Sequence, residues 1–320
     1  MDIGLMLKQA WQVTWQHKFL WVPGFFAGLT GLSVAIARLF LGTRVTAIAR
    51  ELLAWAEQPQ PAPFPFTFDY SGADLLRFSI EAVVVFLVIF LLFWVIATIA
   101  EASIIQVVVS AERGEAIGLG ASLRAGFHWL GRFVAIDAAV FFPWFVLALI
   151  IMLVLLVMIL LIGYMAFSNV ELSTMFAVLG IGSLCLIPLF ILLLPVAWVS
   201  FIYRTIAFRD AVWLDHGVKE SVRHTWQVVR GNLGTAVLIA LLMVAVQSMA
   251  GWVLDLLSLP IFGALAFLGE DSLLRNALGV GVVLVTAVFS GVVYTYVAVA
   301  WTISYKQLTE NREQLTGNEA

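Results

Sequence analysis

The sequence predicts an all-α integral membrane protein. Of its 320 residues, 62% are hydrophobic and only 12% are charged, whereas a soluble domain carries about 25% charged residues. Charge-free stretches recur along the chain, and several have the roughly 20 residues that a helix needs to cross the hydrocarbon core. Such stretches must be helical, because lipid offers the backbone no hydrogen-bond partner outside its own helix. A water-soluble globular domain is therefore excluded.

Six apolar stretches are candidates for membrane-spanning helices. Glu171 divides the longest apolar region into runs of 33 and 32 residues, each long enough to span with tilt. No small-residue cleavage pattern follows the first stretch, so we expect it to remain in the mature protein. The predicted spans are residues 19–37, 82–100, 138–170, 172–203, 231–254 and 276–305. An even number of spans places both termini on one side of the membrane.

The distribution of Lys and Arg predicts which side that is. In this topology 12 of the 17 cations fall on the side of the termini and five on the other side. Four of those five lie in the first loop, where Glu51, Glu57, Asp69 and Asp74 accompany them. Cytoplasmic loops carry an excess of Lys and Arg, so we expect cytoplasmic N- and C-termini. The formal net charge of -3 and the absence of a run of basic residues argue against a nucleic-acid partner.

Three amphipathic stretches, one before each odd-numbered span, are interpreted as cytoplasmic helices in the headgroup region. Apolar residues recur at helical spacing in each of them. These residues are Ile3, Leu7, Trp11 and Trp15; Leu123, Phe127 and Leu130; and Val218, Val222, Trp226 and Val229. The basic residues in or near these stretches are candidate contacts to anionic lipid headgroups: Lys8, Lys18, Arg124, Arg132, Lys219, Arg223 and Arg230.

A weak internal repeat follows the same pattern. Thr14-Trp15-Gln16 recurs as Thr225-Trp226-Gln227, and Ser200–Arg204 resembles Thr302–Lys306 at the ends of two even-numbered spans. The spacing of about 100 residues predicts three parallel units, each an interfacial amphipathic helix followed by two spans. The units are about 1–113, 114–212 and 213–308, within a single membrane domain that ends in a polar tail, 309–320. A chance match between apolar helices is the alternative.

The segment from Ser200 to Gly234 resembles a known family. It contains Tyr203-Arg204, Arg209-Asp210, an amphipathic helix after Gly217, Glu220-Ser221 and Arg230-Gly231-Asn232. It is similar to the integral-membrane domain fused to some bacterial glycerophosphodiester phosphodiesterases, and to related stand-alone bacterial membrane proteins. The resemblance implies a six-span protein of the bacterial cytoplasmic membrane. It covers about a third of the chain and lends no catalytic residues, because no soluble phosphodiesterase domain is present.

Residues typical of catalytic or metal chemistry are few. His17, His128, His216 and His224 occur in no recognised metal-ligand spacing, and the lone Cys185 is interpreted as a small buried hydrophobe. The densest group is Asp210, Asp215, His216, Glu220 and His224. Glu220 and His224 lie one helical turn apart and could hold a metal, but a solvated helix face is the preferred interpretation. We expect no catalytic residue, no metal and no cofactor, and therefore no enzyme.

Ionisable residues cluster near the ends of the predicted spans. They are Arg38, Glu81, Glu101, Asp137 and Asp255. The preferred interpretation is that they mark the membrane boundaries, because a charge inside hydrocarbon is costly. The alternative pairs Glu101 with Asp137 as a cytoplasmic-side proton site, or Arg38 with Glu81 across two spans.

Other segments bear on packing and partners. Gly24, Gly28, Ala287 and Gly291 occur in small-xxx-small patterns that permit close helix approach. The proline-rich segment 59–68 carries Phe64, Phe66 and Phe68. The preferred interpretation is that these rings cover the protein's own outer surface, and the alternative is a docked partner. Residues 256–269 are uncharged and too short to cross, so an interfacial or re-entrant piece is expected.

Two functional hypotheses follow. The first is a non-catalytic scaffold or accessory subunit that engages anionic phospholipid through its basic helices and a membrane-protein partner through the outer loop. It is motivated by the lack of a polar site in the middle of the predicted spans. The alternative is a transporter or channel for a lipid or small solute, motivated by Pro188, Pro195 and the uncharged region around Pro260. Enzymatic activity would need a polar pocket within 210–224.

Overall fold

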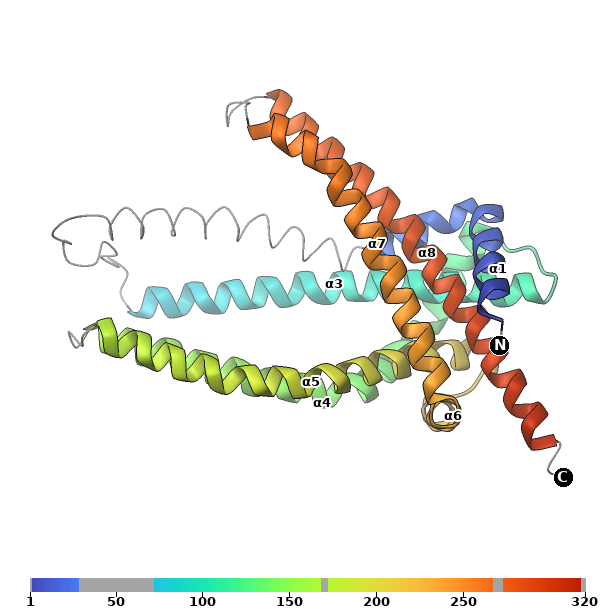
Figure 1. Ribbon diagram of the computed structural model, residues 1–320, viewed down its shortest axis with the longest axis horizontal. Coiled ribbons are helices and arrows are strands. Elements are labelled where there is room, and N and C mark those ends of the chain that lie inside the picture. Colours follow the sequence, from blue (N-terminus) through green and yellow to red (C-terminus); the bar gives the residue numbers. More distant parts are fainter. Residues whose placement is uncertain (1, 29–71, 168–171, 267–272, 318–320) are drawn as a thin grey trace. The chain divides into compact units, whose positions relative to one another are not determined.

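The structure is all-helical. The computed structural model describes residues 2–28, 72–167, 172–266 and 273–317, and no strand occurs within these ranges. Residues 21–28 are also helical and follow the short helix η1. The elements, of which Figure 1 labels the α-helices, are α1 (Ile3–Gln16), η1 (Lys18–Leu20), α3 (Gly72–Glu112), α4 (Leu119–Phe167), α5 (Leu172–Trp213), α6 (Val218–Gly231), α7 (Leu233–Ala266) and α8 (Leu273–Gly317). The predicted all-α class is confirmed.

Four helices within the described residues are long and apolar enough to cross a membrane. These segments are Phe90–Glu112, Leu119–Phe142, Leu233–Ile261 and Ala277–Glu310. Large apolar side chains on them are exposed: Leu257 is 68% exposed and Val285 is 67% exposed. Such surface is unfavourable in water and ordinary against lipid tails. The protein is therefore a membrane protein, while the six spans and the three parallel units stay predictions.

The chain forms two compact units, each assembled from segments distant in sequence. The first unit comprises Gly131–Val244 together with Met1–Met6 and Trp301–Ala320. The second comprises Leu7–Leu130 and Ala245–Ala300. The first unit contains all of α5 and α6, the start of α7 and the last part of α8. This unit therefore holds all five residues of the polar group that the sequence showed from Asp210 to His224.

Helices α4 and α5 form an antiparallel pair in the first unit (Figure 1). Their rings of Phe133 and Phe208 stack with centroids 3.9 Å apart. Further along, Asp137 pairs with Arg204 at 2.6 Å, and Trp144 Nε1 donates to Ser200 Oγ at 2.8 Å. From one contact to the next, the residue number rises along α4 and falls along α5, so the two helices run antiparallel.

The interfacial helices are separate at two of the three expected places. α1 ends at Gln16, and α6 ends at Gly231, before Asn232, whose backbone leaves the helical region with φ -130°. The second amphipathic stretch, 123–130, is instead continuous with the following span in α4. The expectation of a separate helix there was wrong, because a single Gly131 inside a helix costs only about 1 kcal/mol relative to Ala and does not end it.

Two further segments continue helices that we expected to end. α7 runs through Pro260 to Ala266, so residues 256–266 extend a candidate span and do not fold back. α8 runs to Gly317, and the predicted polar tail is thus helical through residue 317. Pro260 lacks the amide hydrogen that would bond the carbonyl one turn earlier, but the flanking turns keep the helix intact.

A close contact between helices confirms part of the small-residue prediction. A Cβ atom added to Gly24 would lie 2.0 Å from Thr295 Oγ1 and 2.3 Å from the Gly291 carbonyl oxygen. Thr295 Oγ1 donates to the Leu20 carbonyl at 3.0 Å and is buried. Residues 21–28 therefore pack directly on the backbone of α8, within the second unit.

We predict that Gly24→Ala destabilises the protein by about 1–3 kcal/mol, the usual cost of forcing extra volume into a packed contact. The measurement is detergent-solubilised thermal or denaturant unfolding followed by far-ultraviolet circular dichroism. Gly281→Ala, in α8, is the matched control because a Cβ atom there meets nothing within 4 Å. Equal stability of the two variants would contradict the close contact.

Candidate functional site

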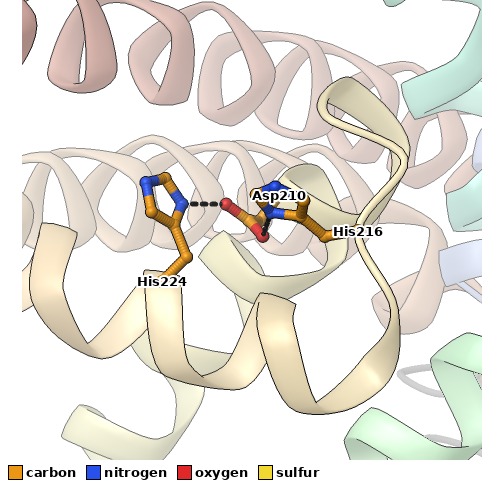
Figure 2. A group of neighbouring side chains, drawn as sticks. All are labelled: Asp210, His216 and His224. Atoms are coloured by element: carbon orange, nitrogen blue, oxygen red, sulfur yellow. Dashed lines mark hydrogen bonds and ion pairs between the residues drawn. The ribbon is translucent and has the colours of Figure 1, made fainter.

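The buried carboxylate of Asp210 is the centre of the candidate site. Asp210 lies near the end of α5 with no exposed surface. Its Oδ2 accepts a hydrogen bond from His216 Nδ1 at 3.0 Å, and its Oδ1 accepts one from His224 Nδ1 (Figure 2). Tyr305 in α8 donates its hydroxyl to Oδ1 at 2.7 Å. A carboxylate is an acceptor, so both imidazoles present Nδ1–H to it.

The connection between α5 and α6 places the two imidazoles. Asp215 adopts a left-handed conformation with φ 54°, which Asp tolerates better than most residues. Arg132 of α4 holds this turn, because its Nη1 lies 2.6 Å from Asp215 Oδ1 and 3.4 Å from the His216 carbonyl oxygen. His216 therefore lies in the turn itself, and His224 lies in the second turn of α6.

Helix α6 is stabilised locally and presents one face to α5. Glu220 is in its first turn and Arg230 in its last, charges that favour the two ends of a helix dipole. The residues of its buried face are Ser221, Thr225, Val228 and Val229. Tyr203 of α5 donates its hydroxyl to the Val222 carbonyl. This helix is thus fixed both by packing and by the Asp210 contacts.

The opposite face of α6 is basic and carries an aromatic ring. Lys219, Arg223 and Arg230 are exposed, and Trp226 is 54% exposed. A tryptophan among cations suits the membrane interface, where one side of the ring meets apolar chains and the other meets headgroups. We call this surface, formed by Lys219, Arg223, Trp226 and Arg230, the basic face.

The remaining headgroup candidates divide into two groups. Lys8, Lys18 and Arg124 are exposed, and Lys18 Nζ lies 5.9 Å from the centroid of the Trp15 ring. Arg132 is instead held in the ion pair with Asp215. That pairing makes Arg132 a structural residue of the turn before α6, a role that the sequence did not indicate.

The predicted boundary residues also differ from one another. Asp137 is buried and forms a two-pronged ion pair with Arg204, whose Nε lies 2.6 Å from Oδ1 and Nη2 3.3 Å from Oδ2. Glu101 is buried in α3, whereas Asp255 is exposed in α7. The Glu101–Asp137 proton site stays a prediction. The side chains of Arg38, Glu81, Phe64, Phe66, Phe68 and Cys185 lie outside the described residues.

The sequence identified part of this site and missed its organisation. Of the predicted group, Asp210, His216 and His224 do converge, whereas Asp215 is exposed and pairs with Arg132. Glu220 pairs with His216 rather than with His224, at 3.7 Å from Oε1 to Nε2. Tyr305 lies 95 residues beyond Asp210, and no nearby sequence pattern predicted its contact with that carboxylate. The only hint was the resemblance between the two span ends that contain Tyr203 and Tyr305.

Comparisons with known proteins add no family or function. No family model matches the chain, and searches of curated proteins and of solved structures return no match. The resemblance of 200–234 to the phosphodiesterase-associated membrane domain therefore stays a prediction.

We predict that Tyr305→Phe lowers the free energy of unfolding by about 1–3 kcal/mol, because it removes one of the donors that compensate a buried carboxylate. Denaturant unfolding in detergent, followed by circular dichroism, measures the change. Tyr296→Phe is the control in the same helix; the Tyr296 ring packs on Trp11, and no hydrogen bond of its hydroxyl occurs within the described part of the chain. A loss of similar size in both variants would show that the Asp210 contact is not the cause.

Proposed function

We propose that the protein is a non-catalytic membrane protein, a scaffold or accessory subunit, whose α6 engages anionic phospholipid. In this proposal the chain has six spans and cytoplasmic termini in a bacterial cytoplasmic membrane. Its outer loop, with Phe64, Phe66 and Phe68, is the docking segment for a membrane-protein partner. No catalytic residue, cofactor or nucleic acid takes part.

The observation that carries the proposal is the position of the basic face relative to a candidate span. α6 ends at Gly231 and the span candidate in α7 begins at Leu233. Chain continuity therefore keeps Arg230 within three residues of the apolar segment, which supports a position near the phosphates of the headgroup layer. Each cation close to an anionic surface is worth about 1 kcal/mol, so Lys219, Arg223 and Arg230 together give an affinity that a neutral helix lacks.

We expect the triple variant Lys219→Gln, Arg223→Gln, Arg230→Gln to retain less anionic lipid. Three contacts of about 1 kcal/mol each correspond to a loss of affinity on the order of 100-fold. The assay is the ratio of phosphatidylglycerol to phosphatidylcholine that stays bound to protein purified in mild detergent after exposure to an equal mixture. Raising the salt concentration should reduce the wild-type ratio, because exposed charges are screened.

The matched control keeps the charge and changes only the side chains: Lys219→Arg, Arg223→Lys, Arg230→Lys. This variant should retain phosphatidylglycerol as the wild type does. If the neutral and the charge-conserving variants bind the two lipids in the same ratio as the wild type, the basic face has no role in lipid binding.

A second candidate, a transporter or channel for a lipid or small solute, is favoured by Glu101. This carboxyl side chain is buried inside the candidate span Phe90–Glu112, and an ionisable residue within a span often marks a pathway. Buried hydroxyl groups of Thr98 and Ser103 lie on the same helix, each bonded to the carbonyl one turn earlier.

A lipid-scrambling assay distinguishes the two candidates. In proteoliposomes with a fluorescent phospholipid and an external quencher, a lipid transporter exposes inner-leaflet probe beyond the half reached in protein-free vesicles. Glu101→Gln should then slow the process while the protein stays folded. We expect the scaffold function to give no transfer above protein-free vesicles, with or without Glu101.

A further inference from the structure

We propose that Asp210, His216 and His224 form a binding site for a divalent transition-metal ion of the zinc class. This inference goes beyond the proposed function, and it differs from the sequence-based expectation that no metal is bound. The one carboxylate and two imidazoles come from the end of α5, the turn after it and α6 (Figure 2). Such a set of nitrogen and oxygen ligands suits zinc and its neighbours in the first transition row, whereas calcium and magnesium prefer oxygen alone.

The three ligand atoms already lie close together. One carboxylate oxygen of Asp210 and one nitrogen of each imidazole are within 4.8 Å of one another. A tetrahedral zinc ion with bonds of about 2.1 Å separates its ligands by about 3.4 Å. Both imidazoles lie closer to the Asp210 carboxylate than this, so those two distances must widen while the widest pair of ligand atoms closes. These movements fall on the imidazoles, because Asp210 is fully buried while the side chains of His216 and His224 are 23% and 27% exposed.

Two outer contacts support metal binding by orienting the ligands. Tyr305 donates to Asp210 Oδ1 and holds the carboxylate in place. Glu220 Oε1 lies 3.7 Å from His216 Nε2, on the ring nitrogen opposite to the one that faces Asp210. In the metal-bound state the ring proton of His216 lies on Nε2 and no longer on Nδ1, and the Glu220 carboxylate beside Nε2 favours that tautomer. Carboxylate–histidine–metal triads of this kind are common around zinc.

The remaining coordination position faces solvent. Glu220 is exposed and both imidazoles are partly exposed, so a water molecule can complete the shell and an ion can enter without opening the core. A neutral imidazole that holds the ion through Nδ1 carries its ring proton on Nε2, so binding shifts each ring proton from Nδ1 to Nε2 through solvent. The ion then replaces the two hydrogen bonds to Asp210 and fastens α6 to α5 through coordinate bonds.

The test uses the full chain in mild detergent, stripped with a chelator and then titrated with Zn²⁺ against a chromophoric competitor. We expect one site per chain with micromolar or tighter affinity. Co²⁺ should bind at the same site and give the visible absorption of a four-coordinate ion with nitrogen and oxygen ligands. Failure of the wild type to bind Zn²⁺ in this range would falsify the proposal.

Variants assign the site. His216→Ala and His224→Ala should each weaken Zn²⁺ binding more than the roughly 10–100-fold that is typical for loss of an outer contact. His128→Ala, which removes an exposed imidazole of α4 outside the cluster, is the matched control and should bind as the wild type does. Zn²⁺ affinity that survives in the double variant His216→Ala, His224→Ala would place any metal elsewhere and overturn the assignment.

A surface variant keeps the test decisive if a ligand variant fails to fold. Glu220 is 68% exposed, so Glu220→Gln leaves the core untouched. It should weaken Zn²⁺ binding about 10-fold or more, as expected for loss of an outer-shell carboxylate. Because no lipid is added, failure of the metal proposal leaves the proposed lipid contact unaffected, and the reverse also holds. Unchanged Zn²⁺ affinity in Glu220→Gln would contradict the proposed orientation of His216.

Discussion

The compensation of one buried carboxylate determines how the first unit is assembled. A carboxylate away from water costs several kcal/mol unless donors surround it, and Asp210 has no exposed surface. Its donors come from the turn after α5, from α6 and from α8, so the three elements must meet for the group to be satisfied. Arg132 extends the same arrangement to α4 through the turn that carries His216. Polar contacts therefore fix how these helices pack on one another, whereas apolar surfaces alone would allow one helix to slide along the next.

Apolar surface cannot supply that specificity in lipid. Burying a leucine against another helix gains little when the alternative is a hydrocarbon tail, so membrane helices rely on close backbone contact and on polar bonds. The second unit relies on close backbone contact, with Gly24 against Gly291 and a hydrogen bond from Thr295 across the contact. The first unit relies on polar bonds, with Asp137 paired to Arg204 and Asp210 at the centre of its hydrogen-bond donors. The exposed side chains of α7 and α8 remain for the lipid.

The sequence predicted what is local and missed what is distant. Composition gave the all-α class, and helical spacing gave α6 as a separate amphipathic helix, because Asn232 ends it before an apolar run begins. The same spacing failed at 123–130, since nothing between Leu119 and Phe167 ends the helix. The polar group around Asp210 was visible as a cluster, but its geometry depends on Tyr305 and on Arg132, which tertiary packing brings together. Contacts between residues so far apart in the sequence leave no helical spacing pattern from which they could be predicted.

The two faces of α6 suggest what a buried charged residue such as Asp210 contributes: it fixes how the helix is rotated about its axis. On the inner side, His224 reaches the Asp210 carboxylate, and on the outer side Lys219, Arg223 and Arg230 remain exposed. A helix held only by apolar contacts at the membrane surface can rotate about its axis and lose the alignment of its cations. The bond from His224 to a fixed carboxylate prevents that rotation, whether a proton or a metal ion bridges the two groups. The inner polar contacts therefore set the direction in which the basic face points.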